Sequence, residues 1–192
     1  MNNHIDFYFD IISPYAYIAY KNIIKINNVK FNFKPILLGG LHNLVKISAP
    51  AFNERKMKNM KNDCLLIAIK NNIEFQWNTK FPINTLTLMR GYLAIDQSFK
   101  KKFFDICFDC YWRDNEDISD LNILKKILKL AELDEKIFFD KVQSEEIKNK
   151  LKKLTNDAFQ KDIFGAPTFV VNNKIFWGQD RLEYALDEYS FT

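Results

Sequence analysis

The start of the chain carries the pattern that most constrains its fold. The apolar run Ile5–Phe9 predicts a buried strand, and Ser13-Pro14 stands just before a helical spacing of apolar residues. Serine is a favoured N-cap and proline a favoured first residue of a helix. We therefore expect a strand-to-helix junction where the Ser13 hydroxyl and the free N–H groups of the first helical turn converge. Such junctions bind anions or thiolates.

The beginning of the chain is predicted to form a βαβ unit. Apolar spacing predicts a helix over Pro14–Ile26, and Val29–Leu37 alternates in the manner of a second strand. A helix of this length would connect two parallel strands. Gly39-Gly40 then breaks the pattern and ends the unit.

The middle of the chain is predicted to be helical, with Asp120 and Asp134 as N-caps. Helical spacing recurs over residues 54–71, 84–97, 98–111, 120–131, 134–141 and 144–161.

The end of the chain is predicted to add two strands and a helix. Thr168–Val171 and Lys174–Trp177 predict a β-hairpin, and Asp180–Tyr189 predicts a closing helix. Without the helical block the order is βαβ–ββα, which is the thioredoxin-like arrangement. We therefore predict an α/β fold with a large all-helical insertion between its two halves. The predicted domains are a discontinuous thioredoxin-like domain, residues 1–40 and 162–192, and a helical insertion domain, residues 41–161.

Composition argues against several classes of function. The net charge is only +4, and the lysines are interleaved with Asp and Glu, so nucleic-acid binding is not indicated. No window approaches the roughly 20 apolar residues of a membrane-spanning helix, and no secretory leader is visible. The three cysteines, an odd number, fit a reducing compartment. We expect a cytoplasmic protein that binds neither nucleic acid nor membranes.

Two motifs indicate a chemical site. Pro167, at the start of a predicted strand, is either an ordinary strand-opening proline or the cis-proline that faces the first helix in thioredoxin-like folds; Gly165 and the element order favour the cis form. Ser13 and Ala16 stand where thioredoxin-like oxidoreductases carry two cysteines. Without those thiols, dithiol–disulfide exchange cannot occur there. Ser13 is either only an N-cap or a hydrogen-bond donor to a thiolate that a ligand brings.

Two other candidates have simpler interpretations. Cys107 and Cys110 form a CxxC inside an aromatic-rich helical run, with no further ligands for a metal, so we predict buried packing. Asp180 is either the N-cap of the last helix or a carboxylate that accepts hydrogen bonds from an ammonium group of a ligand.

Four segments, read together and in order, resemble the 2-hydroxychromene-2-carboxylate isomerase family. This family belongs to the DsbA-like superfamily and is close to the kappa-class glutathione transferases. The segments are Phe7–Tyr15, Trp112–Ile118, Phe164–Thr168 and Trp177–Leu182.

The resemblance implies that glutathione is the cofactor. Ser13 would contact and activate its sulfur, and Ala166, before a cis Pro167, would pair through its backbone with the cysteinyl part. The segment that would hold the γ-glutamyl end is Trp177, Gly178, Gln179 and Asp180.

Other positions follow from the same resemblance. Ser48 and Lys56 are the nearest matches to the residues that hold the glycyl carboxylate, with serine in place of the usual asparagine. Asn53 and Asn84 would line the pocket of the second substrate. Relatives imply a homodimer that acts on a small electrophilic substrate.

The implied activity is a glutathione-dependent isomerisation in which the thiolate adds reversibly to the electrophile. A kappa-like transferase that forms stable conjugates would use the same site. A DsbA-like thiol oxidoreductase and a non-catalytic glutathione- or peptide-binding protein are the remaining alternatives.

Overall fold

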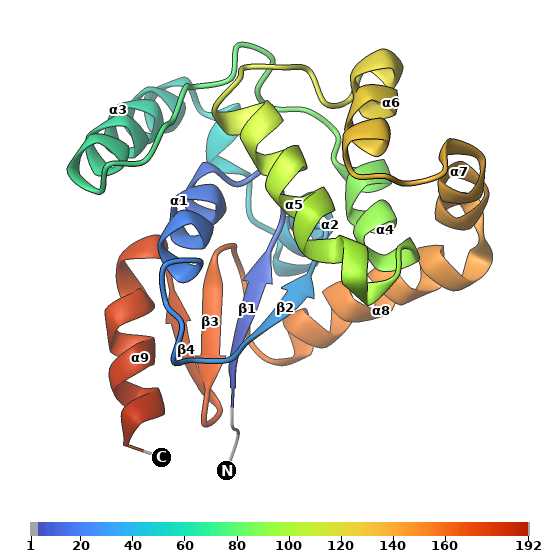
Figure 1. Ribbon diagram of the computed structural model, residues 1–192. Helices are drawn as coiled ribbons and strands as arrows, with labels where there is room; N and C mark the ends of the chain where they lie inside the picture. The colour runs from blue at the N-terminus through green and yellow to red at the C-terminus, as the bar shows by residue number, and fades with distance from the viewer. Residues whose placement is uncertain (1–3, 192) are drawn as a thin grey trace.

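The computed structural model describes residues 4–191 and contains a mixed four-stranded sheet in the order β2-β1-β3-β4 (Figure 1). The strands are β1 (Ile5–Phe9), β2 (Phe31–Pro35), β3 (Thr168–Val171) and β4 (Lys174–Trp177). β1 pairs with β2 in parallel, whereas β1 with β3 and β3 with β4 are antiparallel. The predicted α/β fold, with helices inserted between β2 and β3, is confirmed. The division into two domains stays a prediction, and residues 1–3 and 192 of it lie outside the described range.

Nine α-helices and two 3-10 turns accompany the sheet within residues 4–191. The helices are α1 (Pro14–Ile23), α2 (Leu38–Val45), α3 (Glu54–Lys70), α4 (Leu86–Ala94), α5 (Gln97–Trp112), α6 (Leu121–Leu130), α7 (Glu135–Gln143), α8 (Glu145–Gln160) and α9 (Leu182–Ser190). The 3-10 turns are η1 (Pro50–Phe52) and η2 (Gln179–Arg181).

Several predicted local signals are confirmed by the geometry. The carboxylates of Asp120 and Asp134 accept hydrogen bonds from first-turn N–H groups of α6 and α7, as N-caps do. Asn172 and Asn173 turn the β3–β4 hairpin with φ angles of 50° and 62°, a left-handed conformation that asparagine tolerates better than most residues.

α2 was not predicted, because Gly39 and Gly40 lie inside it rather than ending the preceding pattern. Contacts from distant residues hold this helix in place. Its first N–H group, on Leu38, donates to the carboxylate of Asp10, and its Leu41 side chain is fully buried. Glycine disfavours a helix only by about 1 kcal/mol, so such contacts can override it.

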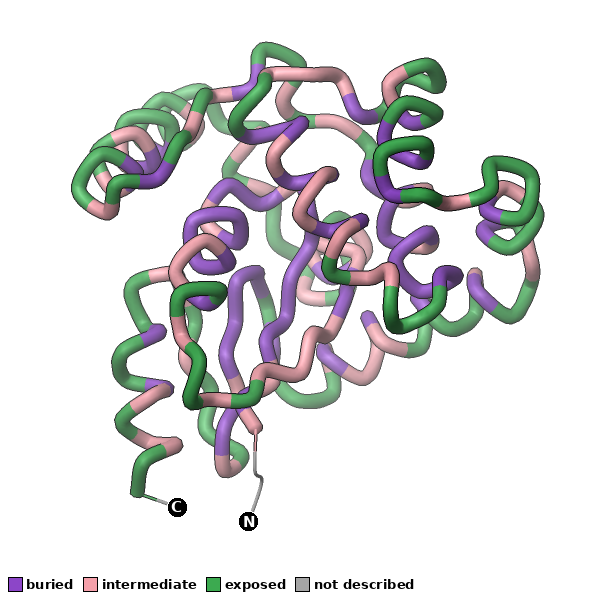
Figure 2. The backbone as a smooth tube through the Cα atoms, in the orientation of Figure 1, coloured by how far each residue is buried: buried purple, intermediate pink, exposed green. Residues whose placement is uncertain are grey.

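The two faces of the sheet bury different layers. Phe7 and Phe9 of β1 belong to a large apolar cluster that includes side chains of α1, α4 and α5. Tyr8 points to the other face, in a smaller cluster with Leu41 of α2 and Ala158 of α8. The buried residues therefore concentrate on β1, β3, α1, α4 and α5, while α3, α6 and α9 expose their outer faces (Figure 2).

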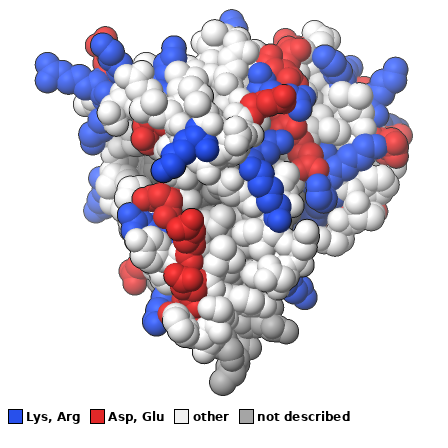
Figure 3. Space-filling view, turned by 60° about the vertical axis from the view of Figure 1, so that its left-hand side comes forward, with Lys and Arg blue, Asp and Glu red and all other residues white. Residues whose placement is uncertain are grey.

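The outer surface carries mixed charge. On the face shown in Figure 3, Lys and Arg side chains are interspersed with Asp and Glu. Among residues 4–191, no helix is long and apolar enough to cross a membrane.

Candidate functional site

The candidate site is built on the loop between β1 and α1. Ser13 has an extended backbone and is the N-cap of α1, with Pro14 as the first helical residue. The Ser13 hydroxyl accepts a hydrogen bond from the Ala16 N–H at 3.2 Å and donates one to the carbonyl oxygen of Ala166 at 2.8 Å. Ser13 is only 4% exposed. The prediction that this serine caps the helix is therefore confirmed, and its hydroxyl also faces the turn that precedes β3.

That turn contains the predicted cis peptide bond between Ala166 and Pro167. The Pro167 carbonyl accepts a hydrogen bond from the Gly178 N–H at 3.0 Å. Since Gly178 follows β4, this bond brings the β4–α9 connection against the proline turn. Three segments distant in the sequence, around Ser13, Ala166 and Gly178, thus meet at one end of the sheet.

An aromatic platform borders this meeting point. The ring centroids of Trp177 and Phe164 are 4.8 Å apart, and Trp177 is 53% exposed. Gly165 permits this arrangement, because a Cβ atom there would lie 2.6 Å from the indole Nε1 of Trp177.

The β4–α9 connection departs from the expected N-cap. Gly178 has a φ of 116°, and Gln179 and Asp180 lie in the turn η2, whereas Arg181 is the N-cap of α9. The interpretation of Asp180 as the N-cap of the last helix is therefore wrong. The carboxylate of Asp180 instead forms an exposed ion pair with Arg181 at 2.9 Å.

Asp10 is the buried polar residue that sequence reasoning missed. Its carboxylate accepts hydrogen bonds from the Thr85 hydroxyl at 2.7 Å, the Leu38 N–H at 2.8 Å and the Ile12 N–H at 3.2 Å. Burial raises the pKa of Asp10 despite these donors. An aspartate at the end of an apolar strand and three residues before Ser13 was the available signal.

Four other predicted positions are exposed and lie outside the group formed by Ser13, Ala166 and Gly178. Ser48 precedes η1, and Lys56 lies in the first turn of α3. Asn53 is the N-cap of α3 and accepts from the Lys56 N–H at 3.0 Å. Asn84 accepts from the Leu86 N–H at 2.9 Å and lines a small hollow of about 160 Å³. In the described part of the chain, no hydrogen bond joins any of these four side chains to Ser13.

All three cysteines are free and buried, so the prediction for the CxxC is confirmed. Burial raises the pKa of Cys107, and burial together with nearby Asp114 raises that of Cys110 to about 11. Such thiols are unreactive near neutral pH. No group of His, Cys, Asp or Glu among residues 4–191 could hold a metal ion.

Comparisons with known proteins place these features in context. A family model, the DSBA-like thioredoxin domain, matches residues 4–190. The chain is 27% identical over 189 residues to a 2-hydroxychromene-2-carboxylate isomerase of Sphingobium xenophagum, covering 96% of each. It is 23% identical to glutathione S-transferase kappa 1 of Homo sapiens, covering 93% of this chain and 87% of that one.

Solved structures share the fold. A 2-hydroxychromene-2-carboxylate isomerase superposes with a TM-score of 0.88 at 18% identity, covering 97% of this chain and 94% of that chain. The cytosolic disulfide reductase DsbM of Pseudomonas aeruginosa, solved with GSH, superposes with a TM-score of 0.64 at 12% identity. The match covers 98% of this chain and 96% of DsbM.

Proposed function

The chain belongs to the DSBA-like thioredoxin domain family, and from this premise we propose that it is a glutathione-dependent isomerase similar to the 2-hydroxychromene-2-carboxylate isomerases. One observation carries the proposal. A serine, not a cysteine, caps α1 and is hydrogen-bonded to the residue before the cis-proline. A site of this kind offers hydrogen bonds to a ligand's sulfur and has no thiol of its own.

The place where the Ser13, Ala166 and Gly178 segments meet, which we call the Ser13 mouth, fits an extended peptide that carries a thiol. Pro14 has no N–H, and the Ala16 N–H already donates to Ser13, so Tyr15 supplies the first-turn N–H for a ligand. Ala166 presents its backbone beside Ser13, where a peptide can pair in the manner of an added strand. Bound glutathione would supply a thiolate nucleophile that adds reversibly to an electrophilic carbon of an enone-like or chromene substrate.

Ser13 would act by exchanging hydrogen-bond partners. Its hydroxyl now donates to the Ala166 carbonyl. When a peptide N–H replaces it at that carbonyl, the Ser13 proton is released to face the ligand's sulfur. This hydrogen bond and the N-terminus of α1 both favour the charged form, and so lower the thiol pKa.

The remaining contacts are proposals of the same kind. Trp177, Gly178, Gln179 and Asp180 would hold the γ-glutamyl end of glutathione. The exposed Asp180–Arg181 pair contributes little stability, so the carboxylate can turn toward an ammonium group at small cost.

For the glycyl carboxylate, Ser48 and Lys56 remain the candidates, and Asn53 and Asn84 remain candidates for the electrophile pocket. A cytoplasmic homodimer also remains a proposal. Sedimentation of the purified protein tests the dimer.

A kappa-like glutathione transferase is the second candidate, favoured by the similarity to the human enzyme. It would use the same mouth but release a stable conjugate. A thiol oxidoreductase lacks support, since the cysteines are buried and none lies at the start of α1.

Calorimetric titration with glutathione tests binding, with Ser13→Ala as the variant and S-methylglutathione as the comparison ligand. We expect heat of binding at millimolar glutathione, and a thiolate absorbance at neutral pH that Ser13→Ala removes. Incubation with 2-hydroxychromene-2-carboxylate then separates the two activities, because an isomerase leaves total glutathione unchanged while a transferase consumes it. Absence of any binding heat would refute the proposal.

A further inference from the structure

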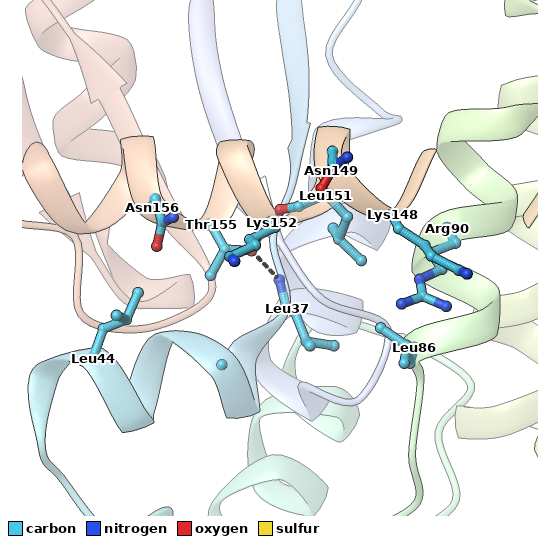
Figure 4. A pocket seen from close by; sticks show the side chains of 11 residues that line it. Leu37, Leu44, Leu86, Arg90, Lys148, Asn149, Leu151, Lys152, Thr155 and Asn156 are labelled. Carbon is cyan, nitrogen blue, oxygen red and sulfur yellow. Dashed lines mark hydrogen bonds between the residues drawn. The ribbon is translucent and has the colours of Figure 1, made fainter. Parts of the chain in front are cut away.

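A second concave site lies on the face of the sheet away from α1. It is a cleft of about 440 Å³ between α2, α4 and α8, a volume within the range of small-molecule sites. Figure 4 shows α8 along one wall and α2 along the other, with Arg90 and Leu86 of α4 at one end and Leu44 and Asn156 at the other. We call it the α2–α8 cleft.

The α2–α8 cleft is distinct from the mouth at Ser13. The helices α2 and α8 bury Tyr8, whereas α1 packs with Phe7 and Phe9 on the opposite face of β1. Neither Ser13 nor Ala166 nor Gly178 lines the cleft. The Leu37 N–H donates to Thr155 in the cleft, while the next N–H, of Leu38, donates to Asp10 of the β1–α1 loop.

The cleft has an apolar floor. Its apolar lining comes from Leu37, Leu44, Leu86 and Leu151. Thr155 is already satisfied, because its hydroxyl accepts from the Leu37 N–H at 3.0 Å and donates to the Leu151 carbonyl at 2.9 Å. A hydrocarbon or aromatic body can therefore occupy this space without leaving that hydroxyl unpaired.

The charge of the lining has one sign. Arg90, Lys148 and Lys152 line the cleft, and none of its lining residues is acidic. Lys148 is paired with the exposed Glu145 at 2.9 Å. Among residues 4–191, Arg90 and Lys152 form no ion pair, and the buried Nε of Arg90 has no hydrogen-bond partner. A buried donor without an acceptor is costly, and a ligand's carboxylate would supply that acceptor.

We propose that the α2–α8 cleft binds a small organic anion with an apolar body. The apolar part would lie against the leucines, and the carboxylate would lie between Arg90 and Lys152. This site is independent of glutathione binding at Ser13.

Isothermal titration with octanoate tests the proposal, with 1-octanol as the uncharged probe of equal chain length. We expect octanoate to bind and octanol to bind at least about tenfold more weakly. Arg90→Met and Lys152→Met remove the charge and keep an apolar stem, and each should weaken octanoate binding about tenfold. Lys153→Met is the matched control, because Lys153 is on the same helix, is exposed, pairs with Asp157 and does not line the cleft. It should bind octanoate normally.

A steric pair gives a second, charge-independent test. Gly40 lines the cleft and Gly39 does not, although both lie in α2. Gly40→Phe should abolish octanoate binding, and Gly39→Phe should not. Glutathione titrations of the same variants should match the unmodified protein, which keeps this inference separate from the proposed function. The inference is overturned if octanoate gives no heat, if octanol binds equally well, or if Arg90→Met, Lys152→Met and Gly40→Phe all bind octanoate normally.

Discussion

The hydroxyl of Ser13 donates a 2.8 Å hydrogen bond to the carbonyl oxygen of Ala166, a residue 153 positions away in the chain. The Ser13 Oγ atom also caps α1, because it accepts a hydrogen bond from the Ala16 N–H at 3.2 Å. One side chain thus joins the start of the first helix to the cis-proline turn, and it fixes the two groups that we propose as partners of a thiol ligand next to each other.

Replacing Ser13 with alanine is expected to lower both stability and activity. The variant loses an N-cap, worth about 1 kcal/mol, and leaves the Ala166 carbonyl without its donor. Loss of one charge-assisted hydrogen bond to a thiolate should slow turnover about 10- to 100-fold. Steady-state kinetics with saturating glutathione measure the second effect.

The control for Ser13→Ala is Ser144→Ala, because the Ser144 hydroxyl also caps a helix and donates to a carbonyl. It accepts from the Ile147 N–H of α8 at 3.3 Å and donates to the Lys141 carbonyl at 2.7 Å, between α7 and α8. This variant should show a similar loss of N-cap stability with unchanged turnover. Equal loss of activity in both variants would mean that Ser13 acts only as a helix cap.

Substituting Gly165 with alanine is expected to displace the indole of Trp177. The new Cβ would lie 2.6 Å from Nε1, and the half-exposed ring can move outward. We expect weaker glutathione binding, with a red-shifted emission that disappears when Trp177→Phe is added. Gly39→Ala, where a Cβ meets no atom within 4 Å, should bind glutathione normally and gain up to about 1 kcal/mol in stability. Unaltered glutathione affinity in Gly165→Ala would argue against a role for Trp177.

The cysteines are expected to be inert in the folded protein. Burial raises the pKa of the thiols of Cys64, Cys107 and Cys110. A thiol reagent at neutral pH should label them only as fast as the chain unfolds, and all three should react in denaturant. Insulin reduction should be absent. Rapid labelling of Cys110, together with reductase activity that Cys107→Ser removes, would revive the oxidoreductase alternative.

Asp10 is expected to make stability depend on pH. Burial raises its pKa in the folded state above the usual value of about 4. The folded form therefore holds the proton more tightly, and this residue's contribution to the free energy of unfolding falls as pH rises from about 4 until it passes the raised pKa.

Asp10→Asn removes this titration. Both carboxylate oxygens of Asp10 accept from a backbone N–H, one from Ile12 and the other from Leu38. The NH₂ group of an asparagine would therefore face an N–H donor in either orientation, at a cost of about 1–3 kcal/mol. Urea unfolding of both proteins across this pH range should show the stability advantage of the unmodified protein shrinking as pH rises. A difference that stays constant with pH would show that Asp10 does not titrate there.

Local signals explain why much of the architecture was predictable. N-caps such as Asp120, Asp134 and Ser13 act on N–H groups within three residues, and the Asn172-Asn173 turn is equally local. The order of strands along the chain and the confinement of the CxxC to a buried helix followed from apolar spacing. The contacts proposed for Ser48, Lys56, Asn53 and Asn84 rest on resemblance alone and remain predictions.

By itself, the sequence determined most of the helices and strands and the absence of thiols at the start of α1, because caps, periodicity and residue identity act over a few positions. Only the tertiary structure decided that Gly39 and Gly40 lie in a helix, that Asp10 is buried against Leu38 and Thr85, and that Arg90 and Lys152 line one cleft. Each of these depends on contacts between residues far apart in the chain. Their free energy comes from burial and hydrogen bonding in the folded state, which no local pattern encodes.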